Sequence, residues 1–142
     1  MRQALELALE AELAGEVPVG AVVVLNNRVI GRGRNSPISA NDPTAHAEIL
    51  ALRQASAATA NYRLEGATLY ATLEPCVMCA GALVAARISR LVFGARDLRF
   101  GGIRSKFRLA DSDVLNHRVE IAEGVLGAEC AELMQQFFTR RR

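Results

Sequence analysis

The chain has 142 residues, of which 51% are hydrophobic and 23% are charged, and its formal net charge is +2 at pH 7. This is the size and balance of one globular domain with a substantial buried core. There is no apolar run of about 18 residues, so we expect no membrane span. The first residues carry acids and no separate apolar segment, which argues against a secretory signal. The three cysteines are therefore expected to stay as free thiols in the cytoplasm.

Basic residues are concentrated in the second half of the chain. Between residues 87 and 108 they face a single acid, Asp97, and three arginines follow at residues 140–142. Acids gather instead near residues 6–16 and 120–132. Such segregation predicts either a polyanionic partner or a solvated arginine-rich loop, and composition alone does not separate the two. The basic residues between positions 87 and 108 are Arg87, Arg90, Arg96, Arg99, Arg104, Lys106 and Arg108.

In chain order, apolar spacing first predicts a helix from about residue 5 that stops at Gly15. Residues 20–25 are β-branched and predict a strand. The two asparagines that follow suit a tight turn, so residues 29–30 should return as the second strand of a hairpin. A loop is expected over residues 31–42. Asp42 and Pro43 then indicate a helix start, as N-cap and first helical residue, with the helix continuing to about residue 60.

The second half of the chain alternates between strands and helices again. Residues 67–73 predict a strand, and Pro75 opens a helix that runs from Cys76 to about Arg87. A strand follows at residues 91–93, and residues 95–117 show no clear pattern. A short strand at 119–121 and a helix at 129–138 complete the chain. These elements predict one α/β domain over residues 1–142, with helices packed on a central sheet.

Two short motifs could carry chemistry: His-Ala-Glu at residues 46–48 and Pro-Cys-Val-Met-Cys at residues 75–79. Cys76 and Cys79 are three residues apart at a helix start, so both sulfurs can reach one ion. A helix N-terminus also favours the thiolate that a metal requires. With His46 as a third ligand, one nitrogen and two sulfurs suit tetrahedral zinc and leave its fourth position to water.

Glu48 follows His46 by two residues, so its side chain leaves the helix in another direction and can flank the metal without binding it. Zinc lowers the pKa of a bound water to about 7, and a neighbouring carboxylate can carry its protons. A purely structural zinc site would need a fourth ligand, and only Cys130 and His117 remain. We interpret Cys130 as part of the apolar face of the last helix and His117 as a structural residue.

The combination of His-x-Glu with Pro-Cys-x-x-Cys is typical of zinc nucleobase deaminases. Over nearly its whole length the chain resembles the bacterial tRNA-specific adenosine deaminases, within the cytidine/deoxycytidylate deaminase superfamily. The matching segments are residues 17–22, 42–49, 72–82, 92–97 and 116–120. The chain departs from the family at residues 101–105, where Gly-Gly-Ile-Arg-Ser replaces the usual Gly-Ala-x-Gly-Ser and brings in Arg104.

The resemblance implies a three-layer α/β/α cytidine-deaminase-like fold with a five-stranded mixed sheet, a homodimer, and one Zn²⁺ per chain held by His46, Cys76 and Cys79. The implied reaction is hydrolytic deamination of adenosine to inosine at the wobble position of tRNA anticodons. In it, a zinc-bound hydroxide would attack C6 while Glu48, the catalytic residue, shuttles protons.

The resemblance also implies where the substrate binds. Asn35 would hydrogen-bond the purine, since an amide offers both a donor and an acceptor. Val19 would line the base pocket, Asp97 would lie beside the sugar, and Phe138 would lie against the anticodon loop, where apolar faces compensate for lost stacking. Ala47 completes the implied set. The basic segments, Arg104 included, would then contact phosphates.

Two other functions stay open on the residues alone. One is a deaminase of a free base or nucleoside, such as guanine or cytosine, which would use the same zinc chemistry without needing a basic surface. The other is a non-catalytic RNA-binding module stabilised by zinc. Glu48 separates this last alternative from the enzymes, because a structural site has no use for a carboxylate beside the metal.

Overall fold

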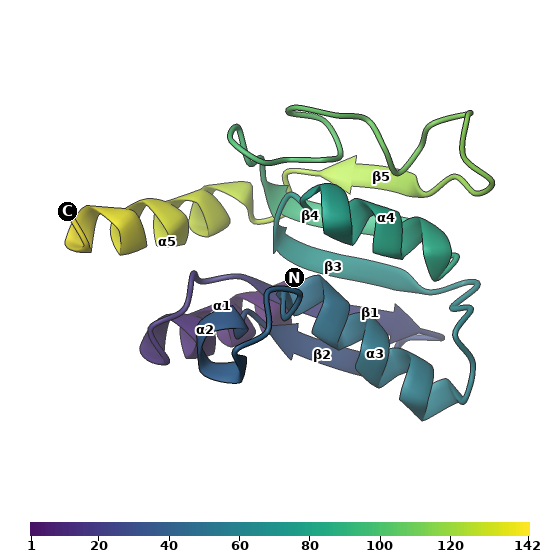
Figure 1. Ribbon diagram of the computed structural model, residues 1–142, viewed down its shortest axis with the longest axis horizontal. Helices are drawn as coiled ribbons and strands as arrows, with labels where there is room; N and C mark the ends of the chain where they lie inside the picture. The colour runs from purple at the N-terminus through teal and green to yellow at the C-terminus, as the bar shows by residue number, and fades with distance from the viewer.

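The computed structural model describes residues 1–142 and shows a sheet between two layers of helices (Figure 1). The strands, in the spatial order β2-β1-β3-β4-β5, are β1 (Gly20–Leu25), β2 (Arg28–Arg34), β3 (Thr68–Leu73), β4 (Arg90–Ala95) and β5 (Glu120–Glu123). The helices are α1 (Arg2–Leu13), α2 (Pro37–Ala40), α3 (Ala47–Thr59), α4 (Val77–Ala85) and α5 (Gly127–Arg140). The three-layer arrangement and the five-stranded mixed sheet agree with the predicted fold.

The sheet is mixed because the chain enters it through a hairpin and continues through crossovers. β1 pairs antiparallel with β2, which confirms the predicted hairpin, and antiparallel with β3 on its other side. β3, β4 and β5 are parallel, and α4 provides the crossover between β3 and β4. Parallel strands end at the same edge of a sheet, so the segments leaving β3 and β4 begin side by side, as in other open α/β sheets that bind ligands there.

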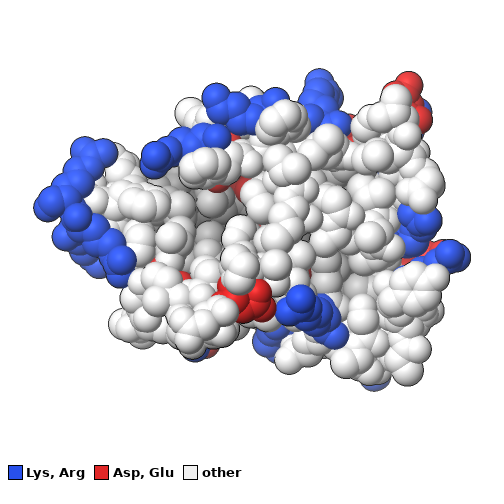
Figure 2. Space-filling view, in the orientation of Figure 1, with Lys and Arg blue, Asp and Glu red and all other residues white.

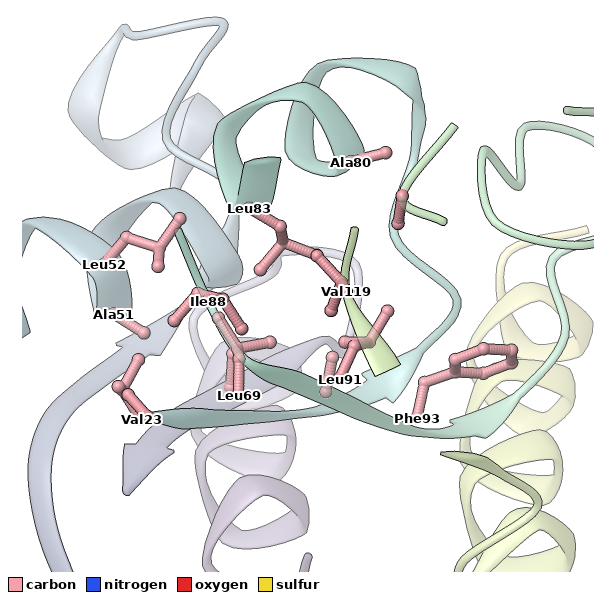
Figure 3. Close-up of a cluster of buried hydrophobic side chains, with 14 of the residues drawn as sticks. Val23, Ala51, Leu52, Leu69, Ala80, Leu83, Ile88, Leu91, Phe93 and Val119 are labelled. Atoms are coloured by element: carbon pink, nitrogen blue, oxygen red, sulfur yellow. The ribbon is translucent and has the colours of Figure 1, made fainter. Parts of the chain in front are cut away.

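The main core lies between the sheet and the layer formed by α3 and α4 (Figure 3). Large apolar side chains in this layer, such as Leu69, Leu83, Leu91 and Phe93, are 0% exposed. Each such burial contributes about 1.5–3 kcal/mol to folding. α1 and α5 contact the opposite face, over β1 and β4 respectively. No helix is both long enough and apolar enough to cross a bilayer.

Helix α3 packs closely on the hairpin because the facing positions carry no side chain. A Cβ added to Gly33 would fall on the carbonyl oxygen of Ala47, and one added to Gly31 would fall on that of Ala51. Ala47, Ala51 and Ala55 are themselves 0% exposed. The backbone of α3 therefore lies directly against the backbone of β2, and the sheet fixes the position of its first turn.

Two boundaries differ from the predictions. β2 continues through residues 31–34, predicted as loop, because the glycines there are strand positions that make room for α3. α3 begins at Ala47, so the predicted start at Asp42 and Pro43 is wrong. Asp42 instead forms a tight turn, accepting hydrogen bonds from the backbone N–H (2.8 Å) and the hydroxyl (2.7 Å) of Thr44.

Candidate metal centre and active site

The three predicted metal ligands meet at the edge of the sheet where β3 ends. His46 is the N-cap of α3, Cys76 is the N-cap of α4, and Cys79 lies in the first turn of α4. Nδ1 of His46 lies 3.6 Å from each sulfur, and the three donor atoms lie within 4.8 Å of one another. Two helix N-termini therefore meet at this group, and their partial positive charge favours thiolates.

The geometry of these donors fits a tetrahedral zinc ion. Zn–N bonds of about 2.0–2.1 Å and Zn–S bonds of about 2.3 Å place nitrogen and sulfur about 3.5–3.6 Å apart at a tetrahedral angle. A hydrogen bond between the two thiol groups lowers the pKa of Cys76 to about 4 and raises that of Cys79. A bound divalent cation would displace the remaining thiol proton and keep both sulfurs ionised.

No fourth protein ligand joins the group. Cys130, 1% exposed, is buried in α5, as predicted. The Nε2 atom of His117 lies 2.7 Å from the carbonyl oxygen of Ile88, which gives this side chain a structural partner. Three protein ligands with one position left over are the pattern of catalytic zinc sites, whereas structural zinc sites have four.

Glu48 lies in the first turn of α3 and is only 4% exposed. It lines the same cavity as His46 and Cys76. Burial raises the pKa of its carboxyl to about 7, because charge is disfavoured away from water. A carboxyl that titrates near neutral pH can both take up and release a proton during a reaction.

A cavity of about 460 Å³ opens from these residues to the surface, a volume within the range of about 300–1,000 Å³ typical of small-molecule sites. Figure 2 shows a hollow between the end of α5 and the loop that follows β4. Its lining includes Val19, Asn35, Asp97 and Phe138, four of the predicted substrate residues. They come from distant parts of the chain, and the fold brings them together around the metal group.

Two polar residues of the cavity lining, Asn35 and Asp97, already accept hydrogen bonds from backbone N–H groups. Oδ1 of Asn35 accepts the backbone N–H of Ala47 at 3.0 Å, and no hydrogen bond engages its Nδ2 group, which remains available to a ligand. The side chain of Ala47 is 0% exposed and lies behind the wall, so it offers the cavity no surface. Oδ1 of Asp97 accepts the backbone N–H groups of Arg99 (3.0 Å) and Phe100 (3.1 Å), which leaves Oδ2 available.

Sequence reasoning gave no site role to several residues of the cavity wall, among them Glu74, Phe100 and Met134. Glu74 precedes the cysteine motif by one residue and lies in the matching segment 72–82, but these signals gave it no role of its own. Phe100 lies in the segment without periodicity and is 64% exposed at the cavity mouth. Met134, on the apolar face of α5, both packs against the core and lines the cavity.

Many of the clustered arginines form ion pairs with acids, which the sequence did not indicate. Arg104 is the clearest case: its side chain is 18% exposed, and its Nη2 atom lies 2.9 Å from Oδ2 of Asp111. Arg90, Arg96 and Arg140 also form ion pairs, with Glu120, Glu123 and Glu12 respectively. The cluster members with neither an ion pair nor a side-chain hydrogen bond are Arg99, Lys106, Arg108 and Arg142.

Glu16 anchors the wall opposite the β4 loop. It is 1% exposed and accepts the backbone N–H of Ser39 at 2.7 Å and that of Ile38 at 3.4 Å. These contacts hold the short helix α2, which was not predicted and which carries Pro37 of the cavity lining. Burial alone would raise the pKa of Glu16, but the hydrogen bonds outweigh burial and keep it below the ordinary value of 4.5.

Glu16→Gln is therefore expected to lower stability at pH 7 by about 1–3 kcal/mol, the cost of disturbing hydrogen bonds to a buried charged group. Because the folded-state pKa is depressed, this contribution is complete above pH 4.5 and is lost as the pH falls through the lower value. The stability gap between variant and wild type, measured by urea unfolding, should close on acidification. A gap that is equally wide at pH 3 and pH 7, or a similar loss in the exposed-residue control Glu6→Gln, would contradict this account.

Comparison with known proteins identifies the family. The family model of MafB19-like deaminases matches residues 1–142. The tRNA-specific adenosine deaminase of Haemophilus influenzae is 54% identical to this chain over 143 aligned positions, which cover 100% of the chain and 83% of that relative. The chain belongs to the tRNA-specific adenosine deaminase family.

Solved structures agree with this assignment. The deaminase matches, with a TM-score of 0.90 and 45% identity, a structure from a study of A-to-I editing by tRNA:A34 deaminases at the wobble position of transfer RNA, over 94% of this chain and 96% of the other. It also matches the guanine deaminase of Bacillus subtilis, with a TM-score of 0.67 and 30% identity, over 95% of this chain and 89% of the other. The fold thus serves deaminases named for different purines.

Proposed function

We propose that this deaminase hydrolyses adenosine to inosine at the wobble position of tRNA anticodons. The observation that carries the chemistry is a buried carboxyl, Glu48, that shares a cavity with a three-ligand metal group. The substrate class is supported by the names of the Haemophilus relative and of the tRNA:A34 deaminase structure. Zinc held by His46, Cys76 and Cys79 would supply a Lewis acid that makes a water molecule nucleophilic.

Glu48 carries the protons of this reaction. Its carboxylate takes a proton from the water that attacks C6 and delivers it to N1 of the purine. The carboxylate then takes the second proton from the new hydroxyl on C6 and passes it to the amino group. The bond between C6 and that nitrogen breaks as the C6 carbonyl forms, so adenosine and water give inosine and ammonia. The raised pKa, about 7, suits a group that must be base and acid in one cycle.

The cavity walls orient the nucleoside. The Nδ2 group of Asn35 donates to an acceptor on the purine ring, while its Oδ1 accepts the backbone N–H of Ala47. Val19 and Phe138 offer apolar surface to a base removed from its stack. Oδ2 of Asp97 accepts a hydrogen bond from the sugar.

Outside the cavity, the unpaired basic residues contact the RNA backbone. Arg99 lines the cavity mouth, and Lys106 and Arg108 follow in the same loop. Figure 2 shows Lys and Arg side chains on both sides of the hollow, along the loop after β4 and at the end of α5. We further propose one deaminase domain over residues 1–142, a homodimer and a cytoplasmic location, in keeping with the family.

Deamination of a free purine is the second candidate, favoured by the likeness to the Bacillus subtilis guanine deaminase. The deciding experiment incubates the zinc-loaded enzyme with an anticodon stem-loop that has adenosine at the wobble position. Inosine should form there and not in a stem-loop whose adenosine is moved by one position. Free adenosine, guanine and cytosine should remain unreacted. Turnover of free guanine with the stem-loop untouched would overturn the proposal.

A further inference from the structure

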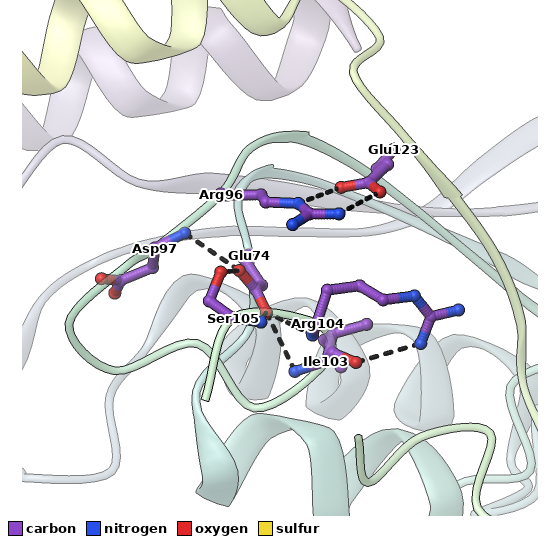
Figure 4. A network of polar contacts seen from close by, with 7 residues as sticks. All are labelled: Glu74, Arg96, Asp97, Ile103, Arg104, Ser105 and Glu123. Atoms are coloured by element: carbon purple, nitrogen blue, oxygen red, sulfur yellow. Dashed lines mark hydrogen bonds and ion pairs between the residues drawn. The ribbon is translucent and has the colours of Figure 1, made fainter. Parts of the chain in front are cut away.

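Glu74 is a buried carboxylate next to the metal group for which the proposed reaction has no use. It follows the last residue of β3 and is 2% exposed, yet no Lys, Arg or His side chain pairs with it. Its hydrogen-bond donors all come from residues 97–105, the loop that follows β4 (Figure 4). The hydrogen bonds from this loop are therefore what stabilises the buried charge of Glu74. The same hydrogen bonds fix the loop in position.

The two oxygens of Glu74 divide this loop between them. Oε1 accepts the backbone N–H groups of Ile103 (3.1 Å), Arg104 (2.6 Å) and Ser105 (2.9 Å). Oε2 accepts the backbone N–H of Asp97 at 3.0 Å and the hydroxyl of Ser105. Oε1 therefore binds only the far end of the loop, whereas Oε2 binds Asp97, at the end that lines the cavity, together with the Ser105 hydroxyl.

The residues after Glu74 fasten the same loop to the start of α4. The backbone N–H of Gly102 donates to the carbonyl of Pro75 at 2.8 Å, and Gly101 forms an isolated β-bridge with Cys76. A Cβ added to Gly101 would fall on the Glu74 carboxylate, so this approach needs glycine. Three consecutive residues, the last of them a metal ligand, thus set the position of the loop.

The contact with Asp97 extends to the mouth of the cavity. Asp97 accepts the backbone N–H groups of Arg99 and Phe100, so a shift of Asp97 moves all three lining residues together. We propose that Glu74 is a positioning residue that fixes the distance between the substrate-facing Asp97 wall and the metal group. The substrate contact of Asp97 rests on the proposed function; the anchoring of its backbone does not.

Glu74→Gln tests the separate roles of the two carboxylate oxygens of Glu74. The amide oxygen can replace Oε1 and keep its three N–H partners, while the amide NH₂ then faces the N–H of Asp97, donor against donor. Ser105 can turn its hydroxyl to accept. The variant should bind zinc, and its kcat/KM for the stem-loop should fall about 10- to 100-fold, mainly through KM. Ser105→Ala, which leaves the Asp97 contact in place, should stay within about twofold of wild type.

A double-mutant cycle with Asp97→Ala separates positioning from general stability. If Glu74 acts through Asp97, Glu74→Gln should cost little in a chain that already lacks the Asp97 carboxylate. Equal losses in both backgrounds would overturn the proposal. Amide hydrogen exchange gives a readout without substrate: in Glu74→Gln, the N–H of Asp97 should lose protection while those of residues 103–105 keep theirs.

The exchange measurement also keeps this inference distinct from the proposed function. If the wild type does not deaminate the stem-loop, but the N–H of Asp97 alone loses protection in the variant, the proposed function is wrong. The proposal that Glu74 positions Asp97 is then still supported. Should Glu74→Gln not fold, Glu74→Asp keeps the charge but withdraws it from the loop, and the same loss of stem-loop activity is expected. Failure of both variants to fold with zinc bound would make Glu74 a residue of the fold as a whole, and the proposal wrong.

Discussion

Glu48→Gln is expected to reduce deamination of the stem-loop by about a thousandfold or more while zinc stays bound. General acid–base catalysis contributes about 10²- to 10⁴-fold, and Glu48 is proposed to act in several proton transfers of one cycle. The amide has nearly the shape of the carboxyl but cannot carry a proton between water, N1 and the leaving amine. Because a buried carboxyl is replaced by a neutral group, the melting temperature should not fall.

The assay compares single-turnover rates and zinc content for wild type, Glu48→Gln and Glu48→Ala, with the exposed-residue variant Glu65→Gln as control. Both Glu48 variants should contain one zinc per chain, as the control does. If zinc is lost in them, Glu48 is a ligand and not a proton carrier. If Glu48→Gln retains a rate within tenfold of wild type, another group moves the protons.

Cys79→Ser should lose zinc and, with it, several kcal/mol of stability. Cys79 is 0% exposed in the first turn of α4, and the hydroxyl that replaces it is a poor ligand for zinc. A ligand present at about 1,000 times its dissociation constant stabilises a fold by about 4 kcal/mol, which is the scale of the expected loss. The variant should unfold at the denaturant concentration at which the chelator-treated wild type unfolds.

Cys130→Ser is the matched control, because Cys130 is equally buried but lies in α5, outside the metal group. It should lose packing energy without losing zinc, so a chelator should still lower its stability. Metal content by mass spectrometry and urea unfolding with and without chelator check both variants. A full zinc complement in Cys79→Ser would remove this cysteine from the ligand set.

The chemistry of the site was predictable because its signal is local. His46 and Glu48 are the two ends of one three-residue motif, and Cys76 and Cys79 lie at the start of one helix. The relation between the two motifs is not local, and it follows from a fold in which both helices begin at the same edge of the sheet. The resemblance supplied that fold, whereas residue spacing alone predicted only one α/β domain.

The errors arose where a distant residue decides a local structure. Asp42 and Pro43 form a good local helix start, but the N–H of Ala47 is bonded by Asn35 from the end of β2, and the helix begins there. Helix α2 depends in the same way on Glu16. The pairing of Arg104 with Asp111 spans a loop without periodicity, so the sequence showed the positive charge and not its partner.

The contact between α3 and β2 determines which side of the cavity can be altered. The glycines of β2 and the alanines of α3 are in direct contact there, and no longer side chain can change its rotamer to make room. A larger residue at this contact would therefore displace the whole helix, and Glu48 with it. The opposite side consists of a loop and the end of a helix, and Phe100 and Phe138 are partly exposed there. Attempts to broaden the range of accepted nucleosides should therefore be confined to that side, where a change in shape need not disturb the proton carrier.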